Sequence, residues 1–263
     1  AWSDPDPPDF VWEDPAHPAL AELRDCLPEA IRAATDPWEQ VLRLSTFVAD
    51  HWAPVHLKSA FEYTPWDPFA IMSWVKSREG LSRRDPVGFC VHGAVLFTTA
   101  CLALGIPARN YCISPGLELS SGHFISEVWH AGSRQWRQVD AKCDVTYEQN
   151  GHVLSLWEMV QQRPRLNEFT VPGPSYARQE SHIHDFITGT IGTGTSYRHI
   201  ALWPRNDYLS HPELTPPAHG TVAYCETSWQ WLDASADGPL GMFPVRRAAS
   251  TLLAPPPPPW DRI

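Results

Sequence analysis

The sequence predicts an α+β fold in which helices pack on an antiparallel sheet and a central helix begins at Cys90. Residues 90–104 contain no proline, are apolar nearly all round and stop at Gly105, which is typical of a buried helix with a glycine stop. Residues 123–130 and 135–140 are strand-like runs joined by a short Ala-Gly-Ser turn, which indicates an antiparallel pair. Helices packed beside such a sheet define the α+β class.

The first third of the chain is expected to be mainly helical. Residues 1–18 are rich in proline and aspartate and predict an extended arm. Residues 19–34 predict a helix that Pro28 breaks or kinks. Two Asp-Pro pairs then supply an N-cap carboxylate followed by proline at the first helical position. They predict one helix from residue 37 to about 52 and a second that ends at Val75.

The remaining segments are less regular. Residues 108–114 predict a strand, whereas 79–88 and 115–121 predict loops. Periodicity weakens beyond about residue 170, and the five prolines at 255–259 suit a polyproline II spacer or exposed tail. We therefore divide the chain into three parts, which are an N-terminal arm and helix (1–34), a core (35–165) and a C-terminal extension that packs on the core and ends in the polyproline tail (166–263).

Composition and charge exclude several functions. The 263 residues suffice for one large domain with extensions, and no apolar run of ~18 residues or more predicts a membrane span. The net charge of −10 disfavours nucleic acid and anionic membranes as partners. The N-terminal residues resemble no signal peptide, and the scattered cysteines are expected to be reduced thiols, so we expect a cytoplasmic protein. Arginine far outnumbers lysine, which hints at a bacterial source.

Three residues stand in the local settings that covalent acyl transfer by a thiol needs. Cys90 is expected at a helix N-terminus, where unpaired N–H groups lower the pKa of a thiol. His123 opens one strand and Asp140 ends the next, so an imidazole could pair with the thiol while a carboxylate fixes its tautomer. The backbone N–H of Cys90 is a natural oxyanion donor. Taken alone, each residue also has an ordinary structural interpretation. Cys90 could be a buried core cysteine, His123 a strand-end histidine bonded to the backbone, and Asp140 a turn carboxylate.

The surrounding motifs resemble those of the transglutaminase-like superfamily. Gly88-Phe89-Cys90, the apolar helix after it and Gly105-Ile106-Pro107-Ala108-Arg109 look like the core motif of that family. Gly122-His123-x5-Trp129 and Trp136-x2-Val139-Asp140 look like its histidine and aspartate motifs. The resemblance covers roughly residues 35–160. It implies a papain-like α+β core with Cys90 as nucleophile, His123 as base and acid, and Asp140 as the orienting carboxylate.

The sequence also departs from the family pattern. Val91 and His92 follow the cysteine, where an acidic or small polar residue is common, and His92 is expected on the helix surface or in packing. Trp52 and Trp74 are candidates for the tryptophan that supports the oxyanion in animal transglutaminases. Calcium-binding carboxylate clusters of the animal enzymes are not recognisable, so no cofactor and no calcium dependence are expected.

A zinc protein is the main competing hypothesis. Cys90-x-His92, His182-x-His184-Asp185, Cys143 and Asp140 supply suitable ligand types, but no CxxC pair or HExxH motif is present. His182 and His184 would flank the active-site mouth if they lay on a strand. The stretch from Gly189 to Thr195 resembles a phosphate cradle only superficially, and we expect a flexible loop there. Trp203, Trp229 and Trp231 are expected to pack on the core.

Taken together, the sequence predicts a cysteine acyltransferase that works through an acyl-enzyme thioester. The donor would be an amide or thioester on a dedicated small molecule or peptide in a bacterial pathway, and the acceptor an amine or water. A carrier protein is a further candidate partner, although the net acidity disfavours docking to an acidic one. A cysteine peptidase or amidase, and a non-catalytic binding module of the same fold, are the alternatives.

Overall fold

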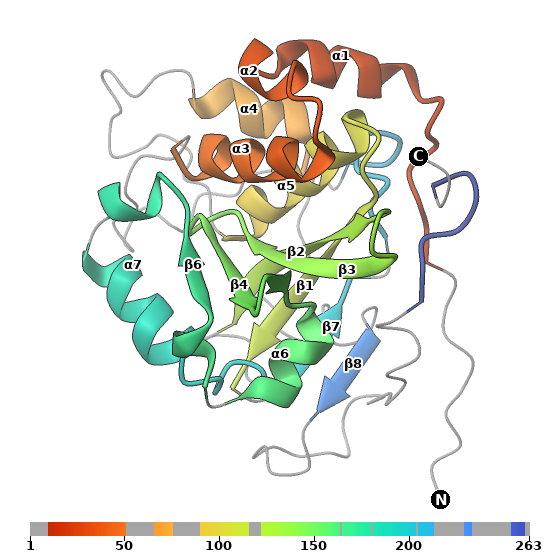
Figure 1. Cartoon of the computed structure of the whole chain (residues 1–263). Helices are drawn as coiled ribbons and strands as arrows, with labels where there is room; N and C mark the ends of the chain where they lie inside the picture. Colours follow the sequence, from red (N-terminus) through yellow and green to blue (C-terminus); the bar gives the residue numbers. More distant parts are fainter. Residues whose placement is uncertain are drawn as a thin grey trace, which may run out of the picture.

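A computed structural model describes residues 10–50, 66–75, 90–115, 122–163, 165–179, 181–203, 205–212, 229–232 and 254–260. Helices α1 to α5 lie together over one face of a central sheet, and α6 and α7 lie away from them (Figure 1). The helices are α1 (Pro18–Cys26), α2 (Glu29–Arg32), α3 (Pro37–Asp50), α4 (Pro68–Val75), α5 (Cys90–Ala103), α6 (Leu156–Gln162) and α7 (Ser181–Asp185). Shorter turns form η3 (Leu166–Glu168), η4 (Tyr176–Arg178) and the π-helix η5 (Phe186–Ile191).

The sheet is antiparallel in every pairing between named strands. Its strands follow the order β5-β4-β3-β2-β1-β7-β8, with β6 beside β4. They are β1 (Ala108–Ser114), β2 (His123–His130), β3 (Gln135–Asp140), β4 (Val145–Gln149), β5 (His152–Val153), β6 (Thr170–Pro172), β7 (His199–Leu202) and β8 (Trp229–Leu232). Helices on an antiparallel sheet confirm the predicted α+β class.

Two hydrophobic clusters hold the sheet between its covering layers. One joins α1, α3, α4 and α5 to sheet residues such as Cys112, Phe124 and Val139. The other joins α6 and η5 to alternate residues of the same strands, including Tyr111 and Ile125. Both faces are thus buried, which explains why β1 and β2 are buried at nearly every position although both contain polar residues.

Helix α5 is the centre of the first cluster. All of its residues after Cys90 are buried, as its uniformly apolar sequence predicts. Buried polar groups also fix it on the sheet, because the Thr98 hydroxyl (2.5 Å) and the Ser126 hydroxyl (2.9 Å) both donate to the Asn110 side-chain oxygen. These bonds tie α5 to β1 and β2, so the helix that begins at Cys90 is fixed on the strand that carries His123.

Most elements up to residue 140 agree with the sequence. The chain breaks between α1 and α2 at Pro28, and α3 and α4 begin at the prolines of the two Asp-Pro pairs. The Asp67 carboxylate accepts hydrogen bonds from the Phe69 and Ala70 amides, as an N-cap should. The predicted loop 79–88 and most of 115–121 lie outside the described residues.

The region beyond residue 170 holds more structure than the sequence indicates. β7 pairs with β1, so the C-terminal extension adds strands to the sheet of the core. The expectation of a flexible loop from Gly189 to Thr195 is wrong, because η5 runs to Ile191. The side chain of Asn167 donates to the Thr188 carbonyl (2.9 Å), and a Cβ on Gly192 would come within 1.8 Å of Asn167 Oδ1. Glycine therefore permits a close approach that orders this turn.

The polyproline stretch is not a spacer. Trp260 is buried and donates from Nε1 to the Glu13 carbonyl (3.0 Å), and Trp136 Nε1 donates to the Ala254 carbonyl (2.7 Å). Trp12 of the N-terminal arm packs beside both indoles. The described parts of the arm and the tail are thus held against the body of the protein by aromatic anchors. The division into parts at 34/35 and 165/166 stays a prediction.

Candidate active site

Three elements bring the predicted site residues together. Cys90 is the first residue of α5, His123 the first of β2 and Asp140 the last of β3. Ser126 pairs with Val139 in the β2–β3 register, so Asp140 lies across from position 125, two residues from His123. Residues two apart on a strand share a face of the sheet. The antiparallel register therefore places the carboxylate beside the imidazole.

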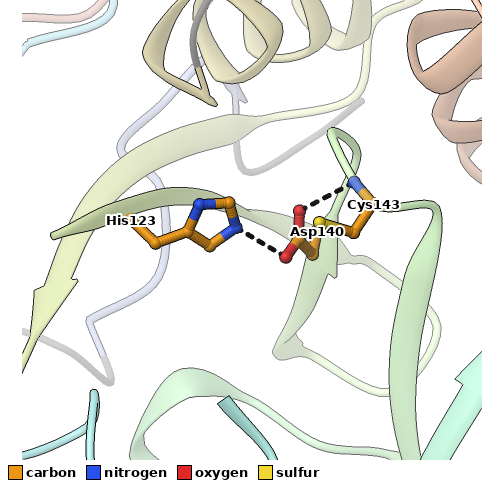
Figure 2. A group of neighbouring side chains, drawn as sticks. All are labelled: His123, Asp140 and Cys143. Carbon is orange, nitrogen blue, oxygen red and sulfur yellow. Dashed lines mark hydrogen bonds and ion pairs between the residues drawn. The ribbon is translucent and has the colours of Figure 1, made fainter. Parts of the chain in front are cut away.

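His123 and Asp140 form a short buried pair. Nε2 of His123 lies 2.7 Å from Oδ2 of Asp140, and both side chains are almost fully enclosed. The other carboxylate oxygen, Oδ1, accepts the backbone N–H of Cys143 at 3.1 Å. Figure 2 shows His123 and Cys143 on either side of Asp140. The carboxylate is thus held at both oxygens, which leaves the imidazole Nδ1 as the nitrogen available to the thiol.

The pKa values of Cys90 and His123 shift in opposite directions. Burial alone would raise the pKa of the Cys90 thiol, but hydrogen bonding to His123, its charge and a hydrogen bond with the Phe124 backbone hold that pKa below its ordinary value. Burial alone would lower the pKa of His123, but the charge and hydrogen bond of Asp140, with smaller contributions from the two thiols, hold it well above its ordinary value. These shifts favour a thiolate beside an imidazolium.

The start of α5 adds a favourable field at Cys90. The first N–H groups of a helix have no partner within it, and the helix dipole places partial positive charge there. No acidic residue lies in the first turn of α5 to oppose that field. Cys90 as a residue is half-buried, whereas Cys101, Cys112 and Cys143 are buried. The helix start and the imidazole both suit a nucleophilic thiol.

Cys143 is a second thiol at the site, and its place beside His123 was missed by the sequence analysis. One ligand atom from each of His123, Asp140 and Cys143 lies within 4.8 Å of the others. Burial, with the Asp140 charge, raises the pKa of Cys143 to about 12. The Cys143 thiol is therefore harder to ionise than an ordinary thiol, whereas the Cys90 thiol is easier to ionise. The one sign of this arrangement in the sequence is that Cys143 follows Asp140 by three residues.

Phe186 was also missed. It is the first residue of η5, far from the motifs in sequence, and its ring meets the His123 ring edge-on at 4.9 Å and 76°. Such a contact stabilises one orientation of the imidazole plane. π-helical turns are often found at functional sites, and here the turn carries the aromatic ring to the histidine.

A buried ion pair supports the strand that carries His123. Arg109 Nη2 lies 2.8 Å from Glu127 Oε2, and the two residues are direct partners in the β1–β2 register. Glu127 Oε1 accepts the Leu156 amide at 2.6 Å, while the Arg109 guanidinium stacks on the Trp136 ring at 3.8 Å. The arginine of the Gly-Ile-Pro-Ala-Arg motif thus acts in the structure of the sheet, away from the thiol.

The other candidates have different places. His92 is buried in α5, so packing rather than a surface position is its role. His182 and His184 lie on helix α7, not on a strand, and the His184 ring packs against Tyr176 in a tilted arrangement with ring centroids 4.4 Å apart. Trp203 is buried, as expected. Trp52 and the side chains of Trp74, Trp229 and Trp231 lie outside what the structure describes. The five described cysteines are all free thiols.

A model of the transglutaminase-like superfamily matches residues 25–141. The match begins at the end of α1 and spans helices α2 to α5 and strands β1 to β3, which include the three candidate site residues. No curated protein and no solved structure matches the chain. The chain therefore contains a transglutaminase-like domain, a class whose members are typically cysteine-dependent enzymes. None of the helices described is both long and apolar enough to cross a membrane.

Proposed function

We propose that the protein is a cysteine acyltransferase in which Cys90 is the nucleophile, His123 the acid and base, and Asp140 the orienting carboxylate. The observation that supports this most strongly is the placement of His123. Its Nε2 is engaged by Asp140 at 2.7 Å while its ring also contacts the half-buried Cys90, whose pKa it lowers. A thiol paired in this way ionises more readily than a free thiol, and its thiolate can attack an acyl carbon.

In the first half-reaction the Cys90 sulfur forms a bond to the carbonyl carbon of an amide or thioester. The backbone N–H of Cys90 would donate a hydrogen bond to the developing oxyanion. The bond from carbon to the leaving nitrogen or sulfur breaks, and His123 gives its Nδ1 proton to the leaving group. The products are the released amine or thiol and a thioester on Cys90.

In the second half-reaction an amine or water attacks the thioester. His123, now neutral, takes a proton from the attacking atom at Nδ1. The carbon–sulfur bond breaks, and Cys90 leaves as a thiolate beside the restored imidazolium. Asp140 keeps the Nε2 proton in place throughout, so that Nδ1 is always the nitrogen that exchanges protons with the substrate.

We further propose a dedicated small-molecule or peptide substrate. Cys90, His123 and Asp140 lie within the family match, whereas residues after 141 supply Cys143, Phe186 and the added strands. A site lined in part by residues outside the family match favours a restricted substrate over general protein cross-linking.

Reaction with a simple acetyl thioester tests acyl transfer. Wild-type protein is expected to gain one acetyl group, mapped to Cys90 by peptide mass, and to pass it to an added primary amine as an acetamide. Transfer to water alone would show a hydrolase of the same mechanism. The Cys90→Ala variant should gain no acetyl group. Acetylation of several cysteines alike in wild type, or of none, would overturn the proposal.

A second assay addresses substrate range. We expect no cross-linking when the protein is incubated with casein and a fluorescent alkylamine, because a dedicated site should not accept glutamine side chains of an arbitrary protein. Rapid incorporation of the amine into casein by wild type but not by Cys90→Ala would contradict a dedicated substrate and indicate general transglutaminase activity.

A further inference from the structure

The cluster of His123, Asp140 and Cys143 holds more ligand chemistry than acyl transfer uses. An imidazole nitrogen, a carboxylate oxygen and a thiol sulfur each lie within 4.8 Å of the other two, and this is the one such group found among the described residues. The three come from β2, the end of β3 and the turn that follows it. The proposed reaction needs the first two, but leaves the Cys143 thiol without a role.

These groups match the ligand set that Zn²⁺ prefers. Zinc binds sulfur at ~2.3 Å, and nitrogen and oxygen at ~2.0–2.2 Å, in tetrahedral geometry. Three protein ligands with water in the fourth position is a common arrangement. Bonds of that length place ligand atoms roughly 3.3–3.8 Å apart. Nε2 of His123 and Oδ2 of Asp140, now 2.7 Å apart, would therefore have to separate slightly. Since no two of the three ligand atoms are more than 4.8 Å apart, the side chains need no large movement to reach zinc-binding distances.

The charges also suit a buried divalent cation. All three side chains are almost fully enclosed, and a buried charge must be neutralised by its ligands. Asp140 and a Cys143 thiolate together carry two negative charges, which equal the charge of the ion. Binding would release the thiol proton of Cys143 and the Nε2 proton of His123 to solvent.

We propose that His123 Nε2, an Asp140 carboxylate oxygen and Cys143 Sγ form an inhibitory site for a thiophilic divalent cation such as Zn²⁺. A cation on Nε2 keeps the remaining imidazole proton on Nδ1, the nitrogen that faces Cys90. With Nε2 on the cation and a proton on Nδ1, His123 has no nitrogen free to take the Cys90 proton. The cation would therefore prevent the thiolate–imidazolium pair from forming and block acylation of Cys90. This consequence rests on the proposed function, whereas cation binding itself does not.

Cobalt provides a direct probe, because Co²⁺ bound to a thiolate absorbs in the near ultraviolet. Titration of the metal-free full chain with Co²⁺ is expected to give one equivalent of this absorption, and Zn²⁺ should displace it. The absorption should persist in Cys90→Ser and disappear in Cys143→Ser. The affinity for Zn²⁺ should fall at least about tenfold in Cys143→Ser. Cys26→Ser removes an exposed thiol and controls for surface binding.

Several results would overturn the site. Absence of the absorption in wild type, its survival in Cys143→Ser, or its loss in Cys90→Ser would each show that these ligands do not hold the cation. Cys143→Ala is a second variant should the serine disturb folding, which circular dichroism would reveal. Because the absorption reports binding whether or not acyl groups are transferred, its failure is distinguishable from failure of the acetyl-thioester assay.

Discussion

Asp140→Asn is expected to slow acylation of Cys90 on the order of 10²-fold, within the range that general acid–base catalysis contributes. Burial alone lowers the pKa of His123, and the Asp140 charge and hydrogen bond are what raise it. Without that charge the imidazolium is no longer favoured. Stopped-flow release of nitrophenolate from p-nitrophenyl acetate, corrected with Cys90→Ala, measures the acylation rate.

The same variant should also narrow the pH range of the reaction. The thiolate–imidazolium pair exists between the lowered pKa of Cys90 and the raised pKa of His123. Removing the carboxylate charge lowers the pKa of His123, so the basic limb of the rate profile moves to lower pH. Glu148 is an exposed carboxylate on β4, and Glu148→Gln should change neither the acylation rate nor the pH of the basic limb. An Asp140→Asn profile like that of wild type would contradict the role of Asp140.

Glu127→Gln is expected to lower the free energy of unfolding by about 3–5 kcal/mol, the usual cost of removing one partner of a buried ion pair. The substitution removes the carboxylate charge that faces the buried Arg109 guanidinium, whose Nε and Nη2 both donate to Glu127 Oε2. It also weakens the acceptor for the Leu156 amide. Reversible urea denaturation measures the change.

An exposed pair provides the matched control for this loss. Arg165 and Glu168 are joined at 2.6 Å, yet both side chains are more than half exposed, where solvent screens their attraction. Glu168→Gln should leave the denaturation midpoint unchanged. Equal and small effects of the two substitutions would show that the buried pair does not stabilise the sheet.

The site elements could be predicted because local sequence determines them. A proline-free apolar run of 14 residues is too long for an ordinary strand and favours a buried helix, so the position of Cys90 at its start could be predicted. The two strand-like runs joined by a short turn set an antiparallel register that brings Asp140 to His123. In each case the relevant interactions lie within a few residues along the chain or across one turn.

The remaining parts depend on contacts between distant residues. Phe186 reaches His123 only because η5 packs against Asn167, and nothing in the local sequence reports that contact. Glu127 could not be recognised as the partner of Arg109 before the β1–β2 register was known. Strand β7 is four residues long and pairs with a strand far upstream, so its own periodicity is too short to identify it.

Alkylation of Cys90 by iodoacetamide near pH 6 tests the thiolate–imidazolium pair most directly. An ordinary thiol with a pKa of about 8.5 is only about 0.3% ionised there and should barely react. We expect peptide mass mapping to find Cys90 labelled selectively in wild type, and labelling to fall by an order of magnitude or more in His123→Ala. Equal labelling of the other cysteines, no labelling at all, or an unchanged rate in His123→Ala would contradict an activated thiol at Cys90.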